Sequence, residues 1–485
     1  MSAKKAAKKG HGTAAKRVET APLIVKQDAG ALTTRQLAVI FGIGFVFGVG
    51  VLYEWGQLNG LPLLTNWGWP WQDLGSFQMG LALLAPFLVI AGVLWVANRE
   101  TSRIPLGVLL GALVLAHFSL QLLSVFADPR GVERISQIVS SANATGYFTD
   151  ALHIQNLREW MAHFHQANVS GHARTHPPGP ILFYYISATL FGTDMGSFLG
   201  GYAVGLVASL GTLVMYAFAG LWTSDRNARL CAAAFYALLP GLTVFFPEFD
   251  QIYPIFAMAM IFYFVGALNE ERRWSFYALA MGLAVFIATF FAYNLLLAGA
   301  FPLYYAIYWW WRRGRTWTAA LTVVRAAAVS LAATACLYGL LWATTGYKAV
   351  AALRHALHAQ QGVNEHMGRG YGISLFADPY DFLLAVGIIA APILWFHLRK
   401  VRKQFEQAPD AVALTVIGLA TILTVDGSGL LRGETARVWL FLQPLVVVPV
   451  ALELGRVRWP WRMALFTMQW WLLVVIKAKM SFVEP

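Results

Sequence analysis

Residues 147–180, YFTDALHIQNLREWMAHFHQANVSGHARTHPPGP, form a polar segment in a chain otherwise dominated by apolar runs. The chain has 485 residues, of which 58% are hydrophobic and only 12% charged, against roughly 25% charged residues in a soluble domain. Apolar runs of about 20 residues, the length that crosses a bilayer core, recur on both sides of this segment. The sequence therefore predicts an all-α polytopic membrane protein, with the polar segment outside the bilayer.

Fourteen apolar runs are candidate helices. They lie near residues 38–56, 78–97, 105–126, 178–193, 197–222, 229–247, 251–268, 275–292, 295–311, 318–343, 376–397, 410–425, 436–453 and 461–477. Because boundaries read from a sequence are imprecise, we expect about 13–14 apolar helices. No internal repeat stands out, which disfavours an inverted-repeat transporter.

The polar segments divide the chain into six parts. Residues 1–35 begin with a Lys-, Ala- and Gly-rich stretch that cannot fold alone, so we expect a disordered basic tail on the cytoplasmic side. The other five parts are transmembrane helices in 36–127, 178–343 and 376–485, and extracytoplasmic loops in 128–177 and 344–375.

Basic residues set the expected orientation, because Lys and Arg favour cytoplasmic loops. The turns predicted to be cytoplasmic are 99–103, 225–229, 270–273, 312–315, 397–403 and 456–462. If the loop 128–177 is outside, the runs 178–193 and 197–222 cannot both span without inverting the turns that follow. Either one run is re-entrant or tilted, with 178–193 the best candidate because Pro177 and Pro178 open it, or the basic turns break the rule.

An amphipathic helix is expected inside the first loop. Leu157, Trp160, Met161 and Phe164 are spaced i, i+3, i+4 and i+7, which places them on one stripe of a helix. Such a helix either lies flat on the membrane surface or packs on other loops. Both arrangements bring the polar face of the loop close to the lipid headgroups.

Two acidic residues of this loop are candidates for a direct role. Asp150 precedes the amphipathic helix, where it can serve as an N-cap or as a general base that takes a proton from an attacking hydroxyl. Asp128 ends the preceding apolar run and is either a turn residue or part of the site.

A rigid stretch follows, in which Arg174 and His176 stand directly before Pro177 and Pro178. Because this proline pair cannot lie inside an ordinary helix, it fixes the backbone there. A guanidinium and an imidazole at headgroup level suit a phosphate or a diphosphate. The alternative is pairing with lipid phosphates or a nearby acid.

Near the C-terminus, residues 426–444 read DGSGLLRGETARVWLFLQP. Ionisable side chains at the start of an apolar run are costly and need a partner or a function. Arg437 either pairs with Glu434 or, together with Arg432, holds the phosphate expected at Arg174 and His176.

Several other residues are candidate contacts to an acceptor or supports for the site. They are Tyr147, His153, His172, Glu248 and Asp250. Glu248 and Asp250 lie in FPEFDQIYP, where helix caps are also common. Five of the 11 histidines fall in 147–180, but no zinc-binding spacing occurs, so neither a metal nor another cofactor is expected. The basic tail shows no base-reading pattern, which disfavours nucleic acid as a partner.

The loop motifs resemble those of membrane glycosyltransferases of the GT-C class, in particular the protein mannosyltransferase-like and aminoarabinose-transferase-like families. TDALHIQNLREWM resembles the acidic segment of their first large loop, and THPPGPILFYYI resembles their Lys/His-Pro-Pro segment. The resemblance implies a GT-C-like fold with a large extracytoplasmic loop. It also implies an acidic catalytic role for Asp150 and a phosphate contact for His176.

These features together favour an integral glycosyltransferase of the bacterial plasma membrane, active on its extracytoplasmic face. The donor would be a sugar on a polyprenyl phosphate, and the acceptor a hydroxyl of a glycan, a lipid or a protein. One displacement with Asp150 as base predicts inversion at the anomeric carbon. The alternatives are a transporter or flippase of a lipid-linked anion, and a metal-dependent phosphotransferase.

Overall fold

The computed structural model describes residues 31–55, 71–99, 104–366, 368–401, 405, 408–481 and 483. All but the last five residues of the predicted basic tail, 1–35, therefore lie outside the described residues. Within the described part the chain is helical, apart from one isolated β-bridge between Trp71 and Met480.

The helices that form the bundle are α1 Thr34–Leu52, α3 Ser76–Ala97, α4 Leu106–Phe126, α8 Gly179–Ala219, α9 Arg226–Ala237, α10 Pro240–Val244, α11 Tyr253–Asn269, α12 Trp274–Phe291, α13 Ala300–Arg312, α14 Trp317–Thr345, α16 Tyr371–Val386, α17 Ala390–Leu398, α19 Pro409–Ser428, α20 Thr435–Val438, α21 Gln443–Arg456 and α22 Trp459–Lys479. Among the described residues, eight helices are long and apolar enough to cross a membrane, or nine if the bent pair α16–α17 is one span. The prediction of a polytopic helical membrane protein is confirmed.

Each of the 14 apolar runs contains helix among its described residues, yet fewer helices pass this length test because several runs are interrupted. The run 229–247 divides into α9 and α10 at Pro240, which cannot donate a helix hydrogen bond. The run 376–397 bends by 106° between α16 and α17, where Gly387 has φ of 102°. The run 436–453 divides into α20, the 3-10 turn Leu440–Leu442 (η5) and α21.

Contacts between distant turns bring the basic residues to one end of the bundle, which we call the basic end. Arg226 donates a hydrogen bond to the carbonyl of Ile104 at the start of α4. Arg312 lies 3.7 Å from Asp410. Glu453 is fully buried and pairs with Lys400 at 2.7 Å and with Arg456 at 3.0 Å. Each of these contacts joins described residues in or beside two of the predicted cytoplasmic turns.

Helix α8 contains the two runs whose topology was in conflict. Gly192, with φ of 77° and ψ of 175°, breaks the helix. Beyond it the chain folds back, since Ser187 donates a hydrogen bond of 2.8 Å to the carbonyl of Gly196. A Cβ on Gly200 would lie 2.7 Å from the Tyr184 ring. The segment 178–193 is thus one arm of a helical hairpin, and whether it crosses the bilayer stays open.

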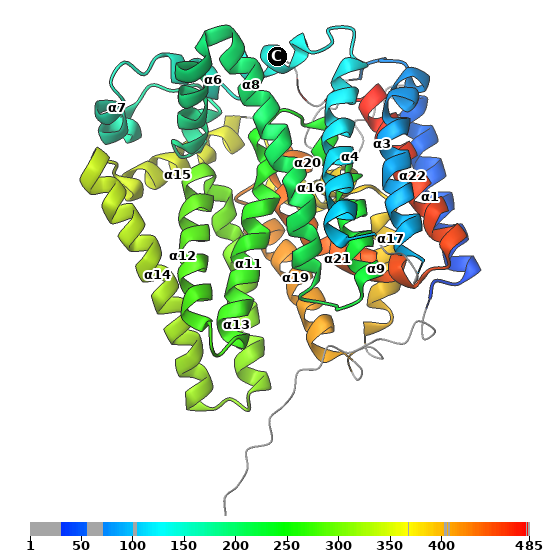
Figure 1. Ribbon diagram of the computed structural model, residues 1–485. Coiled ribbons are helices and arrows are strands. Elements are labelled where there is room, and N and C mark those ends of the chain that lie inside the picture. The colour runs from blue at the N-terminus through cyan, green and yellow to red at the C-terminus, as the bar shows by residue number, and fades with distance from the viewer. Residues whose placement is uncertain are drawn as a thin grey trace, which may run out of the picture.

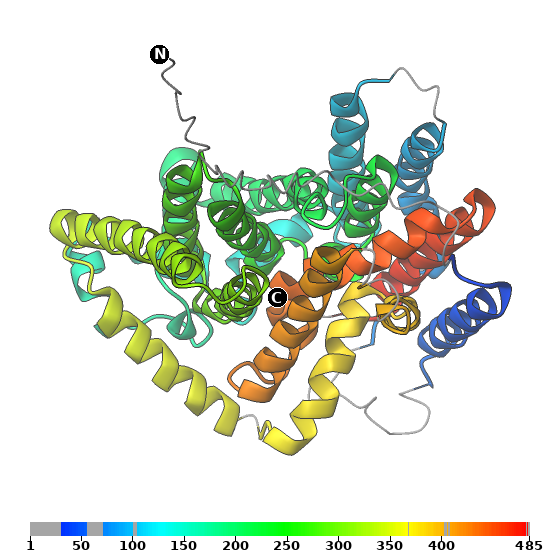
Figure 2. The same ribbon diagram turned by 90° about the horizontal axis from the view of Figure 1, so that it is seen from below.

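The opposite end of the bundle, which we call the loop end, carries the short helices of both predicted loops (Figure 1). They are α5 Glu133–Ser140, α6 Tyr147–Leu152, α7 Leu157–His163, the 3-10 turns η1 Phe164–Gln166 and η2 Ala173–Thr175, and α15 Ala349–His366. Helix α15 runs at a steep angle to the upright helices α12 and α14 (Figure 1) and along the rim of the molecule (Figure 2).

The predicted amphipathic helix is α7. Met161 and Phe164 are buried, whereas Leu157 is exposed. A Cβ on Gly346, the residue that ends α14, would lie 3.0 Å from Ala162, so α7 packs on the end of α14. Its N-cap is Asn156, whose side chain accepts a hydrogen bond from the Glu159 amide. The expectation that Asp150 caps this helix is therefore wrong, because α6 intervenes.

Candidate functional site

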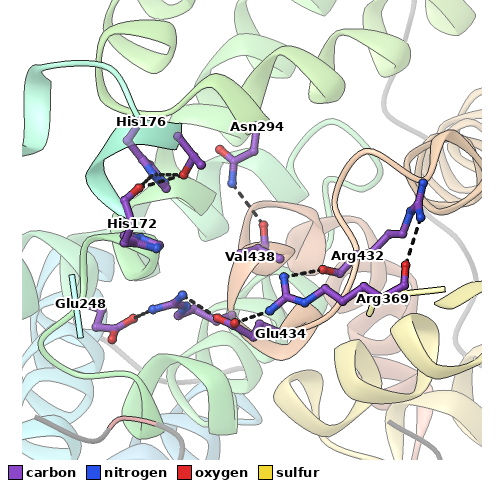
Figure 3. A network of polar contacts seen from close by, with 10 residues as sticks. His172, His176, Glu248, Asn294, Arg369, Arg432, Glu434 and Val438 are labelled. Atoms are coloured by element: carbon purple, nitrogen blue, oxygen red, sulfur yellow. Dashed lines mark hydrogen bonds and ion pairs between the residues drawn. The ribbon is translucent and has the colours of Figure 1, made fainter. Parts of the chain in front are cut away.

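The centre of the loop end is a buried row of ion pairs (Figure 3). Arg437, on the short helix α20, donates one hydrogen bond of 2.7 Å to Glu248 and another of 2.7 Å to Glu434. Glu248 is 2% exposed and Arg437 7%. The predicted Arg437–Glu434 pair is present, and Glu248 joins it from the turn between α10 and α11. A buried cation of this kind needs both carboxylates, because an uncompensated charge there is costly.

A second arginine extends the row toward the loop between α15 and α16. Arg369 donates to Glu434 and, at 2.8 Å, to the carbonyl of Arg432. Arg432 in turn donates to the carbonyls of Arg369 at 3.0 Å and Gly429 at 2.7 Å. Arg432 was predicted to contact a phosphate. Here its guanidinium instead braces the turn that presents Glu434.

The backbone of this turn is fixed by Asp378 of α16. Its carboxylate accepts a hydrogen bond of 2.9 Å from the Gly433 amide, and its carbonyl accepts one of 2.7 Å from the Thr435 hydroxyl. Glu434 between them adopts the left-handed conformation, with φ of 54°, which is uncommon for a residue other than glycine. The network therefore holds Glu434 in a strained position facing two arginines.

Aromatic and imidazole rings from the first loop cover the Glu248 end of the row. Tyr147, on α6, is buried, and its ring centroid lies 5.6 Å from that of His172 and 5.7 Å from that of His176. The two imidazole centroids are 4.5 Å apart. The Nδ1 atom of His176 lies 3.2 Å from the His172 carbonyl. Figure 3 shows both histidines on this side of the row.

Burial controls the charge of these rings. It lowers the pKa of His172 well below its usual range, and the neighbouring His176 and Arg437 lower this pKa further. Burial also lowers the pKa of His176 to about 4, with a hydrogen bond to His172 opposing the shift. Both imidazoles are therefore neutral near pH 7, and each can donate one hydrogen bond and accept another.

Three acidic side chains, Glu248, Asp250 and Glu434, interact electrostatically near these rings. Burial raises the pKa of Glu248 to about 7, which Arg437 opposes and Asp250 reinforces. The Glu434 carboxylate differs: burial raises its pKa, but Arg437 and Arg369 outweigh this and hold the pKa below its usual value. Asp250 is 2% exposed, and within the described residues its carboxylate forms no ion pair. Asp250 interacts electrostatically with Arg437, Tyr147 and Tyr253.

Several buried polar atoms around the row have no hydrogen-bond partner among the described residues. They include Nε of Arg437, Nε of Arg369, Nε2 of His172, Oδ1 of Asn294 and the Tyr147 hydroxyl. Leaving a buried donor unsatisfied costs about 1–3 kcal/mol, so such atoms are uncommon unless a ligand or water serves them. Three of these five atoms are nitrogens that can donate, and the Tyr147 hydroxyl can also donate, which favours a ligand rich in acceptor oxygens.

Asp150 is placed elsewhere in the loop. Its carboxylate accepts hydrogen bonds from the Ser170 amide at 3.0 and 3.1 Å and from the Ser170 hydroxyl at 2.8 Å. Burial raises the pKa of Asp150, while the Ser170 bonds, His153 and Arg174 lower it. Its contacts tie α6 to the segment before η2 and so fix the stretch that carries His172 and His176.

We predict that Asp150→Ala loosens this stretch. Losing the bonds to a charged acceptor, worth about 1.5–3 kcal/mol each, should raise amide hydrogen exchange in peptides covering residues 165–176, with less than about tenfold loss of activity. Asp150→Asn, which keeps one acceptor oxygen, should give a smaller change in exchange. A large loss of turnover with unchanged exchange in Asp150→Asn would instead mark Asp150 as the base.

The remaining predicted residues lie outside the row. Arg174 is exposed and donates to the Val169 carbonyl and the Asn168 side chain. His153 is exposed, with Nδ1 2.8 Å from the Thr149 carbonyl. Asp128 pairs with Arg130 at 2.9 Å. These contacts make Arg174 and Asp128 local loop supports in this structure.

Sequence reasoning missed Asn294, Tyr253 and Asp378. Asn294 donates a hydrogen bond of 3.3 Å to the carbonyl of Val438, one residue beyond Arg437. An asparagine within the apolar stretch AYNLLL was a usable signal, because polar side chains at membrane depth need a reason. Across the described residues, no group of three or more His, Cys, Asp or Glu side chains has the arrangement of a metal site.

No family model matches the chain, and no curated protein matches it. The chain is similar to the crystal structure of ArnT from Cupriavidus metallidurans in the apo state, with 15% identity and a TM-score of 0.47. The match covers 73% of this chain and 60% of that chain, so this chain spans less than two thirds of ArnT.

Proposed function

We propose that this chain is a membrane glycosyltransferase that moves a sugar from a polyprenyl-phosphate donor to a hydroxyl acceptor at the loop end. The observation that carries the proposal is the set of unpartnered buried nitrogens beside Arg437. A phosphate group offers several strong acceptor oxygens to such donors. A donor whose polyprenyl chain is anchored in the bilayer would bring its phosphate to the loop end, where the row of ion pairs lies.

Arg437 would bind the phosphate through its Nε, while its other nitrogens stay on Glu248 and Glu434. His172 would donate from Nε2 in its neutral form. During transfer the bond between the anomeric carbon and the phosphate oxygen breaks, and polyprenyl phosphate leaves with one additional negative charge. Donors already in place where this charge develops lower the barrier, because they need no reorganisation.

We assign the base to Asp250 in place of Asp150. The Asp150 carboxylate is committed to Ser170, whereas that of Asp250 lies among Tyr147, Tyr253 and Arg437 without an ion pair in the described structure. The acceptor oxygen would attack the anomeric carbon while its proton passes to Asp250. A single displacement of this kind inverts the configuration at that carbon.

The rival function, a transporter or flippase of a lipid-linked anion, also needs cations at membrane depth. A transporter has no role for Asp250, a buried carboxylate without an ion pair in the described structure. A glycosyltransferase needs such a carboxylate to remove the proton of the acceptor hydroxyl. Proteoliposomes loaded with a radiolabelled polyprenyl-phosphate sugar and a mixture of lipid and glycan acceptors separate the two. The proposal expects a labelled product with inverted configuration. Label that crosses the bilayer still attached to its lipid, with no product, would contradict it.

A further inference from the structure

Helix α15 presents three different faces. Ala352 and Ala356 are 3% and 4% exposed, and this face is turned to the protein, where α15 packs on η1 and η2. Val350 and Leu357 are one stripe, at i and i+7, and are 65% and 47% exposed. A surface helix that packs only on protein has no use for a second apolar stripe.

The third face of α15, next to the exposed apolar stripe, is cationic. It carries Lys348 just before the helix, then Arg354, His355 and His358. Within the described residues neither Lys348 nor Arg354 forms an ion pair. The acid on this helix is Glu365, near its far end.

Two histidines of the first loop join this face. Burial lowers the pKa of His165, and Lys348, His163 and His355 lower it further by repulsion, which places these groups close together. Nδ1 of His163 bonds the Glu159 carbonyl at 3.0 Å. The Glu159 carboxylate is on the same helix, α7, one turn earlier. Cationic and titratable nitrogens therefore outnumber acids where α15 meets α7 and η1.

We propose that α15 is an interfacial helix that docks on the lipid leaflet at the loop end and binds the phosphate groups of anionic phospholipids. Val350 and Leu357 enter the acyl boundary, and Lys348, Arg354 and His355 meet the headgroups. An apolar stripe flanked by cations is the pattern of a helix lying in the interface plane, and the orientation of α15 relative to the upright helices fits it (Figure 1). Each cation near an anionic membrane contributes about 1 kcal/mol.

The depth of α15 is tested in the full chain, in proteoliposomes of neutral and anionic phospholipid. A nitroxide is attached to Leu357→Cys or, as the matched control one residue on, to His358→Cys. The exposed Cys336 is first replaced by Ser. We expect lipid-soluble oxygen to relax the nitroxide at position 357, and an aqueous nickel chelate to relax the nitroxide at position 358. Equal aqueous access at both positions would overturn it.

Headgroup binding is tested by native mass spectrometry of the anionic lipid retained on release from mixed nanodiscs. Because 1 kcal/mol corresponds to about a fivefold change in affinity, Arg354→Gln should lower retention about fivefold, and Lys348→Gln/Arg354→Gln further. The control, Arg158→Gln, removes an exposed arginine of α7, outside the cationic group on α15, and should change retention by less than about twofold. Equal losses of anionic lipid in Arg354→Gln and Arg158→Gln would contradict the proposal. So would an equal fall in the retention of neutral and anionic lipid in Arg354→Gln.

Discussion

Arg437→Gln should lower kcat/KM for glycosyl transfer by about 10³, because it removes the cation that meets the leaving phosphate. KM for the donor should rise because the phosphate is bound before transfer, and kcat should fall because the phosphate gains charge during transfer. The measurement is the initial rate of product formation in proteoliposomes over a range of donor concentrations. No other substitution should remove more of the donor interaction.

Folding must be separated from function in this variant. Glu248 and Glu434 share Arg437 in the buried row, and removing one partner of a buried pair costs about 3–5 kcal/mol. The double variant Arg437→Gln/Glu248→Gln removes the stranded carboxylate, so it should recover thermal stability while remaining inactive. Arg437→Lys keeps the charge but cannot reach both carboxylates and the phosphate at once. Near-normal transfer in the double variant would contradict a role for Arg437 in donor binding.

Asp250→Asn should lower kcat by about 10³ with little change in KM, because a general base contributes about 10²–10⁴ to the rate. The substitution is nearly isosteric, and within the described residues Asp250 has no ion pair to lose. The rate that remains should also lose the fall toward acidic pH that protonation of the base produces. Transfer rates measured from pH 5 to 9 test both statements.

The matched control is Glu248→Gln, the neighbouring buried carboxylate. Glu248 acts through Arg437, to which it is bonded at 2.7 Å, so this variant should raise KM for the donor more than it lowers kcat. A normal kcat in Asp250→Asn, combined with a large loss in Asp150→Asn, would return the base to the residue that the sequence suggested.

The helical membrane architecture could be predicted from the sequence because apolar length is a local property. The sequence raised the conflict at 178–193 but left two solutions open, a re-entrant or tilted run and basic turns that break the rule. The break itself depends on Gly192 and on the close approach of Gly196 and Gly200 to the first arm. Several glycines in this stretch were compatible with that break, so the sequence alone did not locate it.

The site was predictable in part. Arg437 and Glu434 attracted attention because charges beside an apolar run need partners, but the third member, Glu248, is 189 positions away. Asp150 looked catalytic by its place in the loop, and its partner Ser170 is 20 positions away. Pairings of this kind depend on tertiary packing, which residue type and spacing do not encode.

In the proposed function, a lipid-linked phosphate binds at Arg437 and His172. Its most direct test is a structure of the full chain in nanodiscs supplied with polyprenyl phosphate. We expect phosphate density within hydrogen-bond distance of Nε of Arg437 and Nε2 of His172, with the lipid chain leaving toward the bilayer. Phosphate bound elsewhere, with those two nitrogens occupied by water or by protein, would contradict it.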